Sequence, residues 1–198
     1  PLNCRTLTSK KSHLVWFHVK HTGSVQSKDG KYTRTTLVIR KGGETDEDSD
    51  QYNSRVIHHF WYNTWPDHGV PDDYGAVSGM LQDVRSYSNG EPWVVHCSAG
   101  VGRTGSFIGI DVGTDLLKRY GKVDLLKLIT HLRECRGQSI QSPQQAMFVY
   151  WTLEKFASKW NKDHGFHYCP RCTFETADES KLDEHMAAHK PELKWPVD

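Results

Sequence analysis

Residues 94–105 read Val94-Val95-His96-Cys97-Ser98-Ala99-Gly100-Val101-Gly102-Arg103-Thr104-Gly105. The apolar residues before the cysteine predict a short strand over residues 92–96. From Arg103 the pattern predicts a helix that runs to about Tyr120 and stops at Gly121. A tight turn with two glycines joins the two. A strand, a turn and a helix in this order predict an α/β architecture.

The turn between Cys97 and Arg103 has the composition of an anion-binding nest. Its residues are small, so their backbone N–H groups can converge on one point together with the N-terminus of the helix. Gly100 and Gly102 allow the backbone angles that such a turn requires. Arg103 can close the nest with a bidentate guanidinium, and the set suits a tetrahedral dianion such as phosphate.

The same electrostatic field acts on the thiol of Cys97. A thiol at a helix N-terminus, ringed by N–H donors, loses its proton easily, and the pKa at such sites is about 3.5–7.5. A thiolate aimed at a bound phosphorus indicates covalent catalysis through a phosphocysteine. The alternative is a buried, inert cysteine in a glycine turn. The neighbouring residues argue against this alternative, because the segment also contains His96, Gly100, Gly102 and Thr104.

Residues 96–105, His-Cys-Ser-Ala-Gly-Val-Gly-Arg-Thr-Gly, resemble the signature loop of the protein tyrosine phosphatases. The resemblance implies that Cys97 is the nucleophile and that Arg103 binds the phosphoryl oxygens. It also implies that Thr104 helps the thiolate to leave and that His96 tunes the thiolate. The phosphate would be held by Ser98, Ala99, Gly100, Val101, Gly102 and Arg103.

Two further segments resemble loops of the same family. Residues 65–71, Trp-Pro-Asp-His-Gly-Val-Pro, resemble its mobile acid loop, which makes Asp67 the general acid for the phenolate leaving group. Residues 138–145, Gln-Ser-Ile-Gln-Ser-Pro-Gln-Gln, resemble its glutamine loop. There Gln141 would orient the hydrolytic water and Gln145 would assist. Arg133 and Arg136 resemble the paired arginines upstream, with a solvated helix face as the alternative.

The fold class expected for the chain is α/β, with a twisted mixed sheet flanked by helices as in these phosphatases, plus a small ββα zinc finger. The expected strands cover residues 13–20, 31–40, 54–62 and 92–96, with turns at Gly23 and at Asp29-Gly30. The expected helices run from Asp72 or Asp73 to about Tyr87, from 103 to 120, from 124 to 136 and from Pro143 to about Trp160.

The resemblance covers about Lys31 to Trp160 and leaves the family's N-terminal third, with its phosphotyrosine-clasping loop, without a counterpart. The catalytic domain is expected over residues 1–163.

The charge balance excludes some function classes. The 198 residues hold 25 Lys and Arg and 24 Asp and Glu, so the formal net charge is +1. A general nucleic-acid or membrane binder would need a basic excess. The longest apolar run is Leu14 to Phe17, far short of the ~20 residues that a membrane span needs. We therefore expect no membrane segment in this chain.

The cysteines indicate a reducing compartment. The odd set of Cys4, Cys97, Cys135, Cys169 and Cys172 does not have the spacing of a disulfide framework. No signal peptide is visible. These observations favour an intracellular protein, in the cytoplasm or alternatively in the nucleus.

The C-terminal part of the chain carries a second motif. Its spacing is Cys169-x2-Cys172-x12-His185-x3-His189. This spacing suits a tetrahedral zinc site, with four unrelated residues in a polar tail as the alternative. Phe174 and Leu182 stand where the segment resembles the apolar pair of a C2H2 zinc finger. The resemblance implies a unit over residues 164–192 in which zinc is structural and supplies most of the folding energy.

The charge of this finger argues against nucleic acid as its partner. From Phe166 to Lys190 there are three Lys or Arg and five Asp or Glu, a net charge of −2. That charge opposes binding to phosphates, and a lone finger reads only about 3 base pairs. We expect a structural finger or one that contacts a protein partner.

The sequence therefore predicts hydrolysis of phosphotyrosine in protein substrates through a phosphocysteine, with no cofactor for the chemistry. A dual-specificity phosphatase is the first alternative, because it would share the loop at 97–103. The acid and glutamine loops argue against it. The second alternative is a module that binds phosphotyrosine proteins without turning them over, and the missing N-terminal third favours it.

Overall fold

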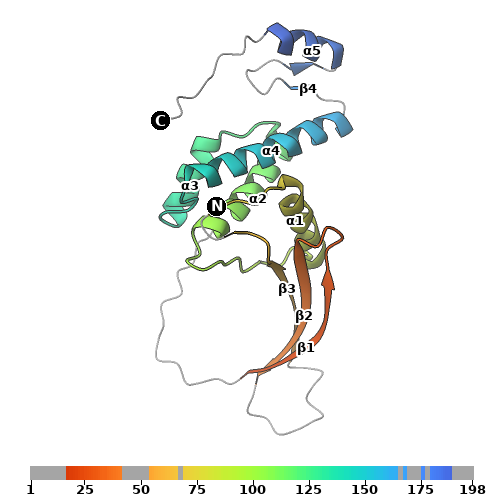
Figure 1. The fold of residues 1–198 in the computed structure, drawn as a ribbon, viewed down its shortest axis with the longest axis vertical. Helices are drawn as coiled ribbons and strands as arrows, with labels where there is room; N and C mark the ends of the chain where they lie inside the picture. The colour runs from red at the N-terminus through yellow and green to blue at the C-terminus, as the bar shows by residue number, and fades with distance from the viewer. Residues whose placement is uncertain are drawn as a thin grey trace.

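The computed structural model describes residues 17–41, 54–66, 69–164, 167–168, 175–176 and 179–188. The elements are β1 (Phe17–Gln26), β2 (Tyr32–Lys41), β3 (Ser54–Tyr62), α1 (Tyr74–Ser88), α2 (Gly102–Tyr120), α3 (Leu125–Cys135), α4 (Pro143–His164), β4 (His167–Tyr168), β5 (Glu175–Thr176) and α5 (Glu179–Ala188). The three long strands lie at one end of the molecule, and helices α1 to α4 lie together beyond them (Figure 1). From β1 to α4 the strands come first and the helices follow, as the sequence predicted.

The sheet has the order β1-β2-β3, and both pairings are antiparallel. One face packs against α1. The rings of Phe60 on β3 and Tyr87 on α1 lie 5.8 Å apart, and the buried Tyr32 on β2 donates its hydroxyl hydrogen to Asp83 on α1. These contacts fix the end of the sheet from which the chain leaves β3 toward the acid loop.

The helix ends follow from capping residues. The Asp73 carboxylate accepts the N–H of Gly75 over 2.7 Å at the start of α1, and Asp124 accepts the N–H of Lys127 over 3.1 Å at the start of α3. Such caps satisfy N–H groups that lack a partner within the helix. Helix α2 stops at Gly121, which has a left-handed φ of +69°. The sequence predicted the stop at Gly121 and left Asp72 or Asp73 open as the cap of α1, and it placed Asp124 as the first residue of α3, where the structure has it as the N-cap.

Helices α2 and α4 carry the centre of the hydrophobic core. Its most deeply buried apolar side chains are Ala76, Val77, Leu81, Ile110, Ile140, Phe148, Val149 and Leu153. The two helices approach closely at Gly113, where an added Cβ would lie 2.5 Å from a methyl group of Leu153. On α4, Tyr150 is 37% exposed, although its helical spacing predicted a core position.

The strand predicted over residues 92–96 is not formed, and the prediction of a mixed sheet is wrong for the described residues. Residues 91–97 are irregular, and Val94 is 92% exposed. Trp93 and Val95 still pack against the core, which explains the alternating pattern. A strand also needs a neighbour with which to exchange backbone hydrogen bonds. Among the described residues this segment has none.

The first strand differs from its prediction as well. It runs from Phe17 to Gln26, whereas a strand over 13–20 with a turn at Gly23 was expected. Residues 13–16 lie outside the described residues. Gly23 is not a turn but part of a β-bulge, because the register with β2 shifts between His21 and Gly23. The turn at Asp29-Gly30 is confirmed, with a φ of +71° at Gly30.

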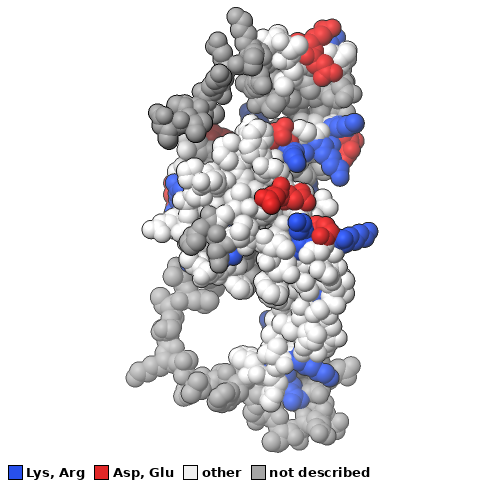
Figure 2. Space-filling model, in the orientation of Figure 1, with Lys and Arg blue, Asp and Glu red and all other residues white. Residues whose placement is uncertain are grey.

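The strands β4 and β5 pair in antiparallel fashion, and α5 follows them as a separate small unit beyond α4 (Figure 1). Acidic side chains gather at this end of the molecule on the face shown in Figure 2, where α5 carries the exposed Asp183 and Glu184. None of the described helices is both long enough and apolar enough to cross a membrane.

Candidate active site

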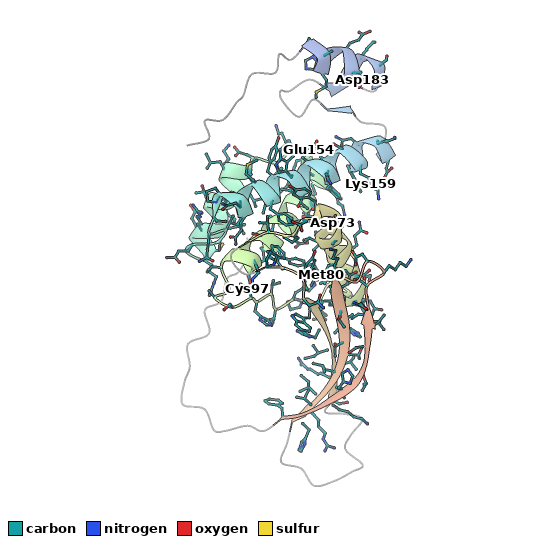
Figure 3. All side chains as sticks on the ribbon, in the orientation of Figure 1. Asp73, Met80, Cys97, Glu154, Lys159 and Asp183 are labelled. Carbon is teal, nitrogen blue, oxygen red and sulfur yellow. The ribbon has the colours of Figure 1, made fainter. Side chains whose placement is uncertain are left out.

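A compact loop over residues 97–101 precedes α2, and Cys97 lies on the side of the helical part that faces away from α5 (Figure 3). Helix α2 begins at Gly102, and its N-cap, Val101, offers no side-chain hydrogen bond. The first N–H groups of the helix are therefore left for a ligand. Gly100 has a φ of +70°, a left-handed conformation that glycine adopts without strain.

The sulfur of Cys97 lies within this ring of donors. The N–H of Gly100 donates to Sγ over 3.2 Å. Partial burial raises the pKa of the thiol, but the hydroxyl of Thr104 and the backbone N–H groups of Thr104, Gly100 and Val101 outweigh it and lower the pKa to about 7. A large fraction of the thiol is therefore ionised at neutral pH, as a nucleophile requires.

Thr104 belongs to the first turn of α2 and is buried. Its hydroxyl oxygen has no conventional hydrogen-bond partner among the described residues. The Cys97 sulfur is the acceptor that it faces, and the hydroxyl is the largest of the influences that lower the pKa of the thiol. A buried hydroxyl without another partner is thus held ready for a negative charge on sulfur.

Arg103 follows on the same turn and is half-buried. Its Nη1 donates to the carbonyl of Trp65 over 3.5 Å, so the phosphate loop, which we define as residues 97–103, contacts the start of the acid loop. The indole of Trp65 is buried and donates to the carbonyl of Gly69 over 3.1 Å. Trp65 and Gly69 thereby hold together the two sides of the acid loop. Asp67 itself lies outside the described residues.

The glutamine loop packs directly on the phosphate loop. The N–H of Ile140 donates to the carbonyl of Val101 over 3.1 Å. The side-chain carbonyl oxygen of Gln145 accepts the N–H of Gln141 over 2.8 Å. Gln145 is buried, and both glutamine side chains lie against Gly102, where an added Cβ would come within 3 Å of each.

The structure therefore brings five of the predicted site residues together: Cys97, Arg103, Thr104, Gln141 and Gln145. In the loop, Ser98 and Ala99 are exposed, Gly100 is half-buried, and Val101 and Gly102 are buried. His96 is exposed, and the described part of the chain provides no hydrogen bond to its ring. The predicted tuning of the thiolate by His96 stays a prediction.

Sequence reasoning missed two residues that position the site. An added Cβ on Gly105 would lie 2.7 Å from the backbone nitrogen of Ile140, so only glycine lets the glutamine loop approach α2 this closely. Ile140 has a φ of +59°, which is rare for a β-branched residue. The glycine is part of the signature motif and could have been found. The conformation of Ile140 has no signal in the sequence.

Of the predicted zinc ligands, only His185 lies within the described residues, half-buried on α5. Cys169, Cys172 and His189 lie outside them. No group of three metal-ligating side chains occurs among the residues that are described.

Comparison with known proteins agrees with this geometry. The family model described as protein-tyrosine phosphatase matches residues 7–155. The chain belongs to the protein-tyrosine phosphatase family. Its active-site loop, acid loop and glutamine loop all lie within the matched range, and the domain is that of a hydrolase.

Individual relatives carry the same family name. The chain is 39% identical to receptor-type tyrosine-protein phosphatase R of Rattus norvegicus over 132 residues, which are 65% of this chain and 19% of the relative. It is 38% identical to tyrosine-protein phosphatase non-receptor type 7 of Rattus norvegicus over 112 residues, 55% of this chain and 31% of the relative. It is 41% identical to tyrosine-protein phosphatase corkscrew of Drosophila virilis over 113 residues, 52% of this chain and 15% of the relative. The chain thus spans between about a seventh and a third of the length of these relatives.

Proposed function

We propose that this chain hydrolyses phosphotyrosine in protein substrates through a phosphocysteine intermediate. The position and the lowered pKa of Cys97 carry the proposal, because a thiolate at a nest of N–H donors suits attack on a bound phosphate. The N–H groups of residues 98–103 would hold three phosphoryl oxygens. Arg103 would neutralise the charge that they share in the transition state.

The first step forms the S–P bond and breaks the bond between phosphorus and the tyrosine oxygen. The departing phenolate needs a proton, and Asp67, as the general acid, would supply it. Arg103 and Trp65 support this assignment, because their contact joins the phosphate loop to the acid loop that contains Asp67.

The second step breaks the S–P bond by attack of water on phosphorus. Gln141 would orient that water with the help of Gln145, and Asp67 would accept its proton. The contact of both glutamines with Gly102 supports this role, because it puts their amides beside the phosphate nest. The hydroxyl of Thr104 would stabilise the thiolate that is released.

The test is phosphate release from a phosphotyrosine peptide by the full 198-residue chain. Cys97→Ser should abolish turnover while peptide binding persists, and Asp67→Asn should slow the release of phenolate by about 100-fold or more. Cys135→Ser, a change at an exposed cysteine on α3, is the matched control and should keep full activity. Equal turnover of a phosphothreonine peptide would instead identify a dual-specificity enzyme. Binding without turnover would identify a phosphotyrosine-binding module.

We further propose that residues 164–192 form a zinc finger beside the catalytic domain over residues 1–163. The hairpin of β4 and β5 supports it, because Cys169 and Cys172 lie between its strands in sequence and α5 carries His185. His189 would complete a Cys2His2 set, which suits tetrahedral zinc. Zinc would be structural there, and catalysis would need no cofactor.

The acidic residues of α5 favour a protein partner over nucleic acid for this finger. Free thiols as zinc ligands and as nucleophile support an intracellular location, in the cytoplasm or the nucleus. Metal analysis of the purified chain should find one zinc ion per chain. Cys172→Ser should lose that zinc while Cys135→Ser retains it, and zinc retained by Cys172→Ser would contradict the proposal.

A further inference from the structure

The three long strands carry basic side chains and no acidic ones. Their sequences contain five Lys or Arg residues and four His residues, but neither Asp nor Glu. At the described end of the sheet that lies away from the helices, the face in Figure 2 likewise shows Lys and Arg without Asp or Glu. The formal net charge of +1 for the whole chain therefore conceals a basic sheet.

Strand β1 is an edge of the described sheet. It pairs with β2 on one side, and no described strand pairs with it on the other (Figure 1). All ten of its residues are exposed. An edge strand directs about half of its backbone N–H and C=O groups away from its neighbour, where a further strand can bind. The β-bulge between His21 and Gly23 interrupts the pairing, so residues 17–21 form one regular part of this edge.

The register with β2 assigns the side chains of β1 to two sides of the sheet. The Arg34 guanidinium lies over a ring of α1, 4.3 Å from the ring centre, so the even-numbered residues of β2 point to the side of α1. Lys20 is opposite Val38 and lies on that side, whereas Val19 is opposite Ile39 and lies on the other. The edge therefore presents different side chains on its two sides.

The side away from α1 is apolar, and the side of α1 is basic. On the apolar side, Phe17 is 59% and Val19 is 57% exposed, with the half-buried Ile39 opposite Val19. On the basic side, Lys20 is exposed and forms no salt bridge with a described residue, and His18 lies two positions earlier. Opposite charges on neighbouring strands attract and like charges repel. This edge therefore favours an acidic strand and disfavours a second copy of the basic sheet.

We propose that β1 binds an extended segment of a partner protein as an additional β-strand, and that acidic and apolar side chains alternate along this segment. The acidic side chains lie beside Lys20, on the side of α1. The apolar ones lie beside Phe17 and Val19, on the other side. In this mode of recognition backbone hydrogen bonds supply affinity and the alternate side chains supply selectivity. The proposal does not depend on catalysis by Cys97.

Single-stranded nucleic acid is the other anionic ligand that a basic sheet can attract, and the aromatic rings disfavour it. Bases need neighbouring rings on which to stack. The exposed Phe and Trp side chains of the sheet are Phe17, opposite Lys41, and Trp61, opposite Thr33. These two positions lie at opposite ends of β2, about 26 Å apart. The aliphatic side chains between them suit contact with protein.

The test measures, by fluorescence anisotropy, the binding of a fluorescein-labelled peptide in which Glu and Val alternate to the full 198-residue chain. The same amino acids arranged in two blocks, and the alternating peptide with N-methylated amides, are the control probes. We expect both control probes to bind about tenfold more weakly, because the first cannot divide its side chains between two sides and the second lacks backbone donors. Binding of the alternating peptide should slow hydrogen exchange at residues 17–21.

Charge-reversal variants locate the acidic contact. Lys20→Glu should weaken binding about tenfold and should instead bind a peptide in which Lys and Val alternate. Lys122→Glu is the matched control, because it makes the same change at an exposed lysine between α2 and α3, and it should leave binding unchanged. If Lys20→Glu does not fold, Lys20→Gln decides, with a smaller loss expected. The acids at residues 44–50 of the chain itself are present in every sample, so their competition is included.

The proposal is overturned if the alternating peptide does not bind, if either control probe binds equally well, or if Lys20→Glu and Lys122→Glu weaken binding equally. Protection from hydrogen exchange elsewhere than on β1 would also overturn it. Displacement of the peptide by oligouridine would replace the protein partner with nucleic acid, and displacement by phosphatidylserine vesicles would replace it with a membrane surface. A chain that binds the peptide without any phosphatase turnover would refute the proposed function and leave this inference standing.

Discussion

The side-chain carbonyl oxygen of Gln141 lies 2.6 Å from the point that a Cβ on Gly102 would occupy, and the amide nitrogen of Gln145 lies 2.9 Å from it. The first residue of α2 must therefore lack a side chain for the two glutamines to rest on the phosphate loop. Gly102 has an ordinary helical backbone, so glycine is required there to leave room for the two glutamine side chains and not for conformational freedom.

Gly102→Ala should slow the second chemical step more than the first. The new methyl group would displace the ends of the Gln141 and Gln145 side chains, which are flexible, so little stability is lost. Misplacement of a positioning group by about 1 Å can reduce a rate by about 100-fold. Rapid-mixing kinetics should show a retained burst of phenol followed by slow turnover.

A double variant controls this prediction. If the methyl group acts through Gln141, then Gly102→Ala combined with Gln141→Ala should turn over no more slowly than Gln141→Ala alone. Additive losses, or a burst that slows as much as the steady state, would show that Gly102 serves phosphate binding instead.

Gly105→Ala should destabilise the fold, because the obstacle is backbone. Its added Cβ would lie 2.7 Å from the nitrogen of Ile140 and 3.2 Å from Cα of Ser139, and neither atom can turn away as a side chain does. Overpacking of this kind costs about 1–3 kcal/mol. Urea unfolding of the two proteins measures the difference.

Gly79→Ala is the matched control, since Gly79 lies inside α1 and has no atom within 4 Å of its added Cβ. Alanine favours a helix interior over glycine, so this change should stabilise the fold by up to about 1 kcal/mol. A gain of stability in Gly105→Ala equal to that in Gly79→Ala would mean that helix propensity, and not the contact with Ile140, decides the outcome.

The phosphate loop could be predicted from the sequence because its parts are neighbours in the chain. Cys97, Gly100, Arg103 and Thr104 occupy one turn and one helix start, so their order alone predicts how they converge. The role of Asp67 stays a prediction of the same kind, because it rests on the seven residues of its loop.

The strand at 92–96 could not be rejected in this way. Alternation of apolar residues tells which side chains can be buried, and Trp93 and Val95 do pack on the core. Whether the backbone joins a sheet depends on a second segment, which the pattern does not report. The hydrogen bond from Ile140 to Val101 could not be predicted for a similar reason. It joins two loops that are separate in the sequence, and it needs a rare φ at Ile140.

Thr104→Val should raise the pKa of the Cys97 thiol above about 7, because it removes the hydroxyl that contributes most to lowering the pKa. Thr104→Ser keeps a hydroxyl and is the matched control. The alkylation rate of Cys97 against pH measures both. We expect the Val variant to need a higher pH for half-maximal rate and the Ser variant to stay near the unchanged chain. Identical profiles for Val and Ser would assign the low pKa to the backbone donors alone.

Folding stability should rise with pH between about 7 and 9. The folded thiol of Cys97 has a pKa of about 7, against an ordinary value of 9.0, so the folded chain releases this proton first. The stability that results is fully present above the ordinary pKa of 9.0 and is lost as the pH falls through the pKa of the folded thiol, about 7. Cys97→Ser removes this titration, so the difference in free energy of unfolding between the two proteins should change across this range. Urea unfolding at several pH values measures it, and parallel curves would mean that the thiol titrates alike in the folded and unfolded chains.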